Sequence, residues 1–256
     1  EPTGTGNVAD LSFSYPLIRQ RSTNLFVRGV IDNKDLTDRF EAVGFETHKR
    51  VRGAGIGLSF ERRDGLLGGG YTSANALLYR GNLDIKDATS EAFDNPPFGY
   101  DTEGSFGKAT LQLARLQSLA PKFSLFLGTG MQRASKNLDA YEKLSLGGPK
   151  AVRAYATGEV LVDDGWLATV ELRYAPRPDT TLFAFYDAAH GDFFHDPRPF
   201  DVFTSRSLRG HGLGLNWSRP GKLSMNFSIA WRSTDPGVTD GGDRNPRLFW
   251  SIQKAF

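Results

Sequence analysis

The chain has 256 residues, of which 39% are hydrophobic and 23% charged, and its 31 basic residues nearly balance its 29 acidic ones. The resulting net charge of +2 gives no electrostatic reason to expect nucleic acid as a partner. The lack of cysteine excludes a disulfide framework and a cysteine-ligated zinc site. No apolar run approaches the roughly 18 residues that a transmembrane helix needs. A transmembrane β-barrel has no such run, because lipid-facing and lumen-facing side chains alternate along each strand.

Alternation with period two, which indicates β-strands, recurs along the chain. It is clearest at 222–232, where Leu223, Phe227 and Trp231 lie on one face and Ser224 and Ser228 on the other. The pattern predicts about twelve strands of the 9–11 residues that cross a bilayer at a tilt. The candidates lie at 11–15, 25–31, 38–48, 54–61, 70–81, 108–113, 123–132, 169–174, 180–189, 210–218, 222–232 and 247–256.

A soluble β-sandwich also has short alternating strands and is the alternative architecture. Three features favour an antiparallel transmembrane barrel instead. Aromatic side chains stand at the ends of apolar faces, as in an interfacial girdle. The opposite faces are rich in glycine and serine, which suits a water-filled lumen. Short Pro/Gly turns alternate with segments of roughly 14–30 residues, as periplasmic turns alternate with extracellular loops.

The C-terminal strand adds a more specific signal. The chain ends at Phe256, and Trp250 and Ile252 lie on the same predicted face. A terminal phenylalanine on an amphipathic strand resembles the assembly signal of bacterial outer-membrane barrels, although Lys254 interrupts its apolar face. This resemblance implies contact with the barrel-assembly machinery.

The segment 134–165 is too long to be a plain connection between strands. Its Gly147-Gly148-Pro149 run predicts a sharp bend, because glycine tolerates positive φ and proline fixes φ. Arg153 follows the bend. If the loop folds into the lumen, this guanidinium needs an acidic partner there, since an unpaired charge in a confined space is costly.

The run from Gly147 to Tyr155 resembles the Gly-Gly…Val-Arg-Gly/Ala-Tyr motif of two-partner secretion translocators, the haemolysin and filamentous-haemagglutinin secretion proteins. These proteins belong to the outer-membrane assembly-factor superfamily. The matching residues are Gly147, Gly148, Pro149, Val152, Arg153, Ala154 and Tyr155. In that family the motif lies on a loop tucked into the pore, and its arginine meets an aspartate of a Phe-x-Asp motif. Here Phe185 and Asp187 match that second motif. Glu171 and Arg173 share the predicted lumen face and are expected to line the pore.

The resemblance covers nearly the whole chain, which is treated as one barrel domain, 1–256. A complete family member also has a signal peptide, two periplasmic transport-associated domains and a sixteen-stranded barrel. The sequence lacks the first two and, by the strand count above, about four strands. It therefore predicts either the C-terminal part of such a barrel or a shorter barrel closed by twelve strands.

The resemblance implies a pore in the bacterial outer membrane that exports one large unfolded exoprotein, a haemolysin or adhesin, without ATP. Outer-membrane lipid surrounds such a pore, and we expect a monomer that needs no cofactor or metal and has no catalytic residues. A passive diffusion porin and a barrel-assembly insertase of the same superfamily are the alternatives. An outer-membrane phospholipase is less well supported, because no serine motif of that family accompanies His211, the one histidine in a clear strand.

Overall fold

The computed structural model describes residues 2–40, 45–219, 221, 223–234, 236–237 and 244–254. Eleven strands form one sheet, and every neighbouring pair in it is antiparallel. The sheet contains β1 (Pro2–Arg19), β2 (Thr23–Phe40), β3 (Phe45–Asp64), β4 (Gly70–Ile85), β5 (Gly104–Ala120), β6 (Phe123–Ala134), β9 (Asp164–Arg177), β10 (Thr180–Asp192), β11 (Ser205–Arg219), β12 (Leu223–Arg232) and β13 (Arg247–Lys254). The predicted all-β antiparallel architecture is confirmed.

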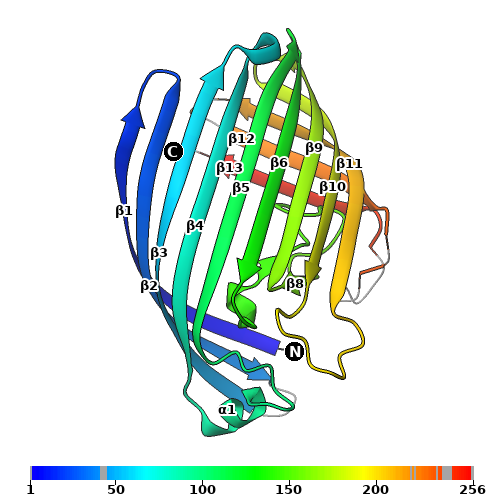
Figure 1. Cartoon of the computed structure of the whole chain (residues 1–256). Helices are drawn as coiled ribbons and strands as arrows, with labels where there is room; N and C mark the ends of the chain where they lie inside the picture. The colour runs from blue at the N-terminus through cyan, green and yellow to red at the C-terminus, as the bar shows by residue number, and fades with distance from the viewer. Residues whose placement is uncertain are drawn as a thin grey trace.

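The remaining elements are small. They are η2 (Leu66–Gly68), α1 (Ala88–Asp94), η3 (Ala140–Glu142) and a two-stranded sheet of β7 (Leu144–Ser145) and β8 (Leu161–Val162). Among the described residues, none of the helical segments is long and apolar enough to cross a membrane. The large sheet curls strongly from β1 to β13, and β7, β8 and their connection lie on its concave side (Figure 1).

The prediction of a separate strand at 38–48 was wrong, although the approximate count of twelve agrees with the structure, which has eleven strands in the large sheet of the described residues. The first residues of this segment end β2 and its last residues begin β3, so it is not a strand of its own. β2 has 18 residues and β3 has 20, well beyond the predicted 9–11. Both strands continue past the length that a bilayer requires. In the parts of β2 and β3 that extend beyond this length, polar side chains occupy both faces. The alternation of apolar and polar residues that identifies a strand is therefore lost there.

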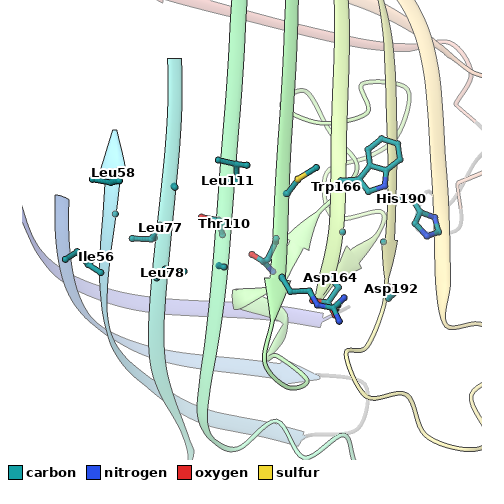
Figure 2. Close-up of a pocket in the computed structure, with 18 of the residues that line it drawn as sticks. Ile56, Leu58, Leu77, Leu78, Thr110, Leu111, Asp164, Trp166, His190 and Asp192 are labelled. Atoms are coloured by element: carbon teal, nitrogen blue, oxygen red, sulfur yellow. Dashed lines mark ion pairs between the residues drawn. The ribbon is translucent and has the colours of Figure 1, made fainter. Parts of the chain in front are cut away.

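The two faces of the sheet differ in chemistry as the alternation predicts. Along the middle of the strands, side chains on the convex face are mostly apolar and exposed, and they pair across neighbouring strands, as Leu58 does with Ala76 and Leu78 with Ile56. A shallow groove of about 830 Å³ runs over this face. Figure 2 shows Leu58, Leu78, Leu111 and Trp166 along it, on β3, β4, β5 and β9. The buried polar side chains of the sheet itself lie mainly on the concave face, as Ser59, Gln132, Glu171 and Asp187 do.

The connections at the two ends of the strands also differ. At one end the chain turns within two to five residues, as between β5 and β6 or β3 and β4. At the other end lie the connections 86–103, 135–163 and 193–204. These three contact one another, because Asn137 Nδ2 donates to the carbonyl oxygens of Tyr100 (2.8 Å) and Asp196 (2.9 Å). This arrangement matches short periplasmic turns opposite long extracellular loops.

Glycines on the concave face make room for two phenylalanine rings of β10. A Cβ at Gly212 would lie 2.5 Å from the Phe185 ring and 2.1 Å from the carbonyl oxygen of Ile229. A Cβ at Gly214 would lie 2.1 Å from the Phe183 ring. The two rings can therefore lie flat over β11 only because positions 212 and 214 have no side chain.

We predict that Gly212→Val destabilises the folded sheet by about 1–3 kcal/mol, because the added side chain overpacks the Phe185 ring and a backbone carbonyl. The measurement is the temperature at which the protein changes, in a detergent gel, from the mobility of the folded form to that of the unfolded form. Gly65→Val is the control, because a Cβ at Gly65 meets no atom within 4 Å. Equal losses in the two variants would contradict the packing argument.

Candidate functional site

The residues 135–163 between β6 and β9 form a loop, here named the inner loop, that lies against the concave face of the sheet. The sequence placed this segment at 134–165, but Ala134 ends β6 and Asp164 begins β9. The inner loop contributes Leu146, Val152, Tyr155 and other buried apolar side chains to a cluster with residues of β10, β11 and β12. It is therefore packed inside the curve of the sheet and does not project outward.

The predicted bend is formed by backbone geometry that requires glycine. Gly148 has a φ of +114°, and a Cβ at Gly147 would lie 2.3 Å from the carbonyl oxygen of Ala156. The Gly148 N–H donates to the carbonyl oxygen of Val152 (3.2 Å), which closes the bend. Pro149 is exposed at its tip. The bend turns the chain back so that Val152 and Arg153 point into the packed interior, where both are buried.

Arg153 binds two acidic side chains on the strand wall. Its Nε and Nη2 donate to the two carboxylate oxygens of Asp187 at 2.9 and 2.8 Å, and its Nη1 donates to Glu171 at 2.7 Å. Its backbone N–H also donates to Asp187 (3.1 Å). Arg153 is 8% exposed and Asp187 1% exposed. The structure thus brings together the motif arginine and the aspartate that the sequence paired with it.

The surroundings of Arg153 keep it charged. Burial alone would lower the pKa of the Arg153 guanidinium, but Asp187 and Glu171 more than offset this effect and raise it. The guanidinium also lies 3.5 Å above the centre of the Phe185 ring, within the range of a cation–π contact. Phe185, which the sequence named as the companion of Asp187, therefore supports the arginine directly.

Glu171 connects the motif arginine to a second arginine. One of its oxygens accepts from Arg153, and the other accepts from Arg173 Nε at 2.8 Å. The Arg173 guanidinium lies 4.4 Å from the centre of the Phe126 ring on β6. Both predicted lumen residues therefore lie on the concave face beside the inner loop.

The other motif residues fix the inner loop by packing. Val152, Ala154 and Tyr155 are buried. A Cβ at Gly210 would lie 2.6 Å from Ala154 Cβ, so the loop approaches β11 closely. The Tyr155 hydroxyl hydrogen-bonds with Thr234 Oγ1 at 2.7 Å.

Two of the predicted assembly residues, Trp250 and Ile252, lie on β13, which is three strands from β10 at the edge of the sheet. Trp250 pairs with Phe227 of β12, and Ile252 pairs with Met225. Trp250 is 73% exposed, on the convex face. Phe256 lies outside the described residues. The role of these three residues stays a prediction.

Two features of the site were not predicted from the sequence. Thr169 Oγ1 donates to Asp187 (2.6 Å) and accepts from Arg153 (2.9 Å). Its position two residues before Glu171 on the same strand face was a usable signal. Glu142 is 1% exposed and binds Lys34 and Lys108. Burial alone would raise the pKa of Glu142, but Lys108 and Lys34 more than offset it and lower it. No sequence pattern identified this carboxylate.

A cavity of about 610 Å³ lies between the inner loop and the strand wall. Polar and apolar side chains of β4, β5, β6 and β9 line one side, and Glu142, Lys143 and Arg153 line the other. No group of three His, Asp or Glu side chains within the described ranges could hold a metal ion. The geometry provides a cavity of mixed polar and apolar lining beside a fixed loop.

Comparison with known proteins identifies the family. Residues 2–235 match the model of the haemolysin secretion/activation protein ShlB/FhaC/HecB family, and the chain belongs to this family. The heme/hemopexin transporter protein HuxB of Haemophilus influenzae strain 86-028NP is 27% identical over 249 residues, which cover 94% of this chain and 43% of HuxB. The chain thus spans less than half the length of the curated relatives it matches.

Solved structures show the same fold. CdiB from Escherichia coli superposes with a TM-score of 0.74 at 18% identity, over 98% of this chain and 45% of CdiB. BamA from Haemophilus ducreyi, lacking POTRA domains 1–3, gives a TM-score of 0.52 at 13% identity, over 97% of this chain and 62% of that one. Family membership and the barrel-type sheet place the chain in the bacterial outer membrane.

We predict that Asp187→Asn lowers the free energy for opening the inner loop by about 3–5 kcal/mol, because a buried guanidinium loses its main counter-charge. The effect of Glu171→Gln is expected to be smaller, since Asp187 still pairs with Arg153. The measurement is the rate at which a membrane-impermeant thiol reagent labels Ala151→Cys, in a chain that has no natural cysteine. The exposed Asp196→Asn is the control, and labelling that Asp187→Asn leaves unchanged would contradict the assignment.

Proposed function

We propose that this member of the haemolysin secretion/activation family forms the pore of a two-partner secretion exporter. The cargo is one large unfolded exoprotein, a haemolysin or adhesin, which crosses the outer membrane without ATP. Folding of the exoprotein outside the cell supplies the direction of transport. The observation that carries this proposal is the inner loop fixed against the lumen wall by the buried contact of Arg153 with Asp187.

The chemistry of the cavity supports an unfolded polypeptide as cargo. The wall opposite the loop presents Asn75, Thr110 and Gln112 together with Gly128 and Gly130. A neutral polar side chain can replace a water molecule as the hydrogen-bond partner of a passing backbone. Each such replacement changes the free energy little. Glycines leave space. Apolar side chains such as Leu113 and Phe126 and charged ones such as Lys108 and Glu171 also line the cavity, so it offers contacts to polypeptide segments of different chemistry.

The convex face supports the proposed lipid contact. In the outer membrane, the apolar groove over β3–β9 would lie against acyl chains, while the polar concave face remains in water. We further propose that Trp250, Ile252 and Phe256 are read by the barrel-assembly machinery and that the pore acts as a monomer. No cofactor, metal or catalytic residue takes part in this mechanism.

We predict that Arg153→Ala in the full-length protein reduces exoprotein secretion at least about tenfold, because the inner loop loses a buried, fully hydrogen-bonded charge pair. Arg153→Lys is expected to secrete poorly as well, since an ammonium cannot reproduce the two-pronged contact with Asp187. The measurement is exoprotein in the medium at equal amounts of folded barrel in the membrane. Lys86→Ala, which removes an exposed cation from the neighbouring connection 86–103, is the control.

Other outcomes would point to the alternative functions. Secretion that Arg153→Ala leaves unchanged would remove the inner loop contact from the mechanism. No secretion by either form, with pore conductance intact, would indicate a diffusion porin. Normal secretion with poor assembly of other outer-membrane barrels would indicate an insertase.

A further inference from the structure

The inner loop has a second attachment, which involves residues of β2, β5 and β6. Glu142 in η3 binds Lys34 of β2 at 2.6 Å through Oε1 and Lys108 of β5 at 2.8 Å through Oε2. Its backbone carbonyl oxygen accepts from Lys108 Nζ and from Gln132 Nε2, both at 3.2 Å. Each carboxylate oxygen of this buried residue therefore has its own ammonium partner.

Neighbouring residues strengthen this attachment. Asp139, at the start of η3, binds Lys49 of β3 at 2.7 Å. Leu138 is buried in an apolar cluster with residues of β2, β3, β4 and β5, which include Leu36, Val51, Tyr79 and Phe106. The first half of the inner loop is thus held on β2–β5, whereas Arg153 in the second half is held on β9 and β10.

The two attachments make the inner loop a bridge across the curved sheet. In the sheet order, six strand-to-strand steps separate β2, which carries Lys34, from β10, which carries Asp187. At about 4.8 Å a step, this is roughly 29 Å along the wall. The 610 Å³ cavity, lined by both Glu142 and Arg153, lies between the bridge and the strands of this arc. Detachment of the loop at either end would therefore enlarge this cavity.

The two attachments differ in how readily they can separate. Arg153 is a rigid, planar donor with four side-chain hydrogen bonds to Asp187, Glu171 and Thr169. Lys34 and Lys108 are flexible, with side chains 22% and 16% exposed, so water can replace Glu142 around their ammonium groups. Separation at the lysine attachment leaves ammonium groups that water already reaches, whereas separation at Arg153 leaves a guanidinium whose side chain is only 10% exposed.

We propose that Glu142 is a releasable anchor of the inner loop, and that its separation from Lys34 and Lys108 widens the lumen while Arg153 stays bound to Asp187. This inference rests on the proposed export function, because it names the movement that admits the cargo. Glu142 acts by positioning the loop.

The first test records single-channel conductance of the full-length protein in planar bilayers, with no exoprotein present. Glu142→Gln is expected to raise the occupancy of the high-conductance state about tenfold, because the amide loses both charge-assisted contacts. The double variant Lys108→Glu/Glu142→Lys keeps two cations and one carboxylate in the cluster and is expected to restore the closed state. Glu91→Gln, on an exposed site of α1, is the matched control. Unchanged conductance in Glu142→Gln would overturn the proposal. A double variant that stays in the high-conductance state would also overturn it.

The second test locks the anchor and remains informative if charge substitutions disturb folding. In Lys34→Cys/Glu142→Cys, a short cross-linker that a reductant cleaves should hold the pore closed and block secretion, and cleavage should restore both. Opening or secretion by the cross-linked protein would overturn the releasable anchor. Because the conductance test needs no cargo, loss of the export function would leave its result intact. Conversely, secretion that depends on Arg153 but not on Glu142 would reject this inference alone.

Discussion

The structure depends on one electrostatic constraint, which is that the guanidinium of Arg153 must be compensated inside the curve of the sheet. A buried charge without partners is too costly to persist. Asp187, Glu171 and Thr169 are therefore all directed at it, and the Phe185 ring covers one face. The shape of the loop and the bare glycines of β11 can be understood as conditions for this contact.

Those conditions act at successive levels of structure. The bend at Gly147 and Gly148 sets the direction in which Arg153 leaves the backbone. The absence of a side chain at Gly212 lets the Phe185 ring lie flat enough to meet the guanidinium. Packing of Tyr155 and its neighbours excludes water, which strengthens the ion pair. Local backbone freedom, packing and charge thus support the same position of the loop.

The sequence was sufficient to predict these features because each leaves a local pattern. Period two identified strands such as 210–218 and the concave position of Glu171 and Arg173. The long gap between strands located the inner loop to within two residues at each end. Family resemblance paired Arg153 with Asp187. These two residues are 34 positions apart along the chain, and the alternation of side chains alone could not have predicted that they meet.

What the sequence could not predict depends on contacts without a local pattern. Glu142 is an isolated carboxylate, and its partner Lys34 lies 108 positions away. Nothing near either residue indicates that they meet. The error at 38–48 has a different cause, since β2 and β3 extend beyond bilayer length and lose the contrast between their faces. Both the Glu142–Lys34 contact and the length of β2 and β3 depend on tertiary structure, which no local sequence pattern records.

The central claim is that cargo passes along the concave face beside the inner loop. Gln112 and Leu111 are neighbours on β5 that point to opposite faces, and Gln112 lines the cavity shared with Arg153. The most direct measurement places a cysteine at either position in the full-length protein and cross-links it to an exoprotein arrested during export. We predict cross-links from Gln112→Cys and none from Leu111→Cys. Equal cross-linking from both positions, or none from Gln112→Cys, would contradict the account.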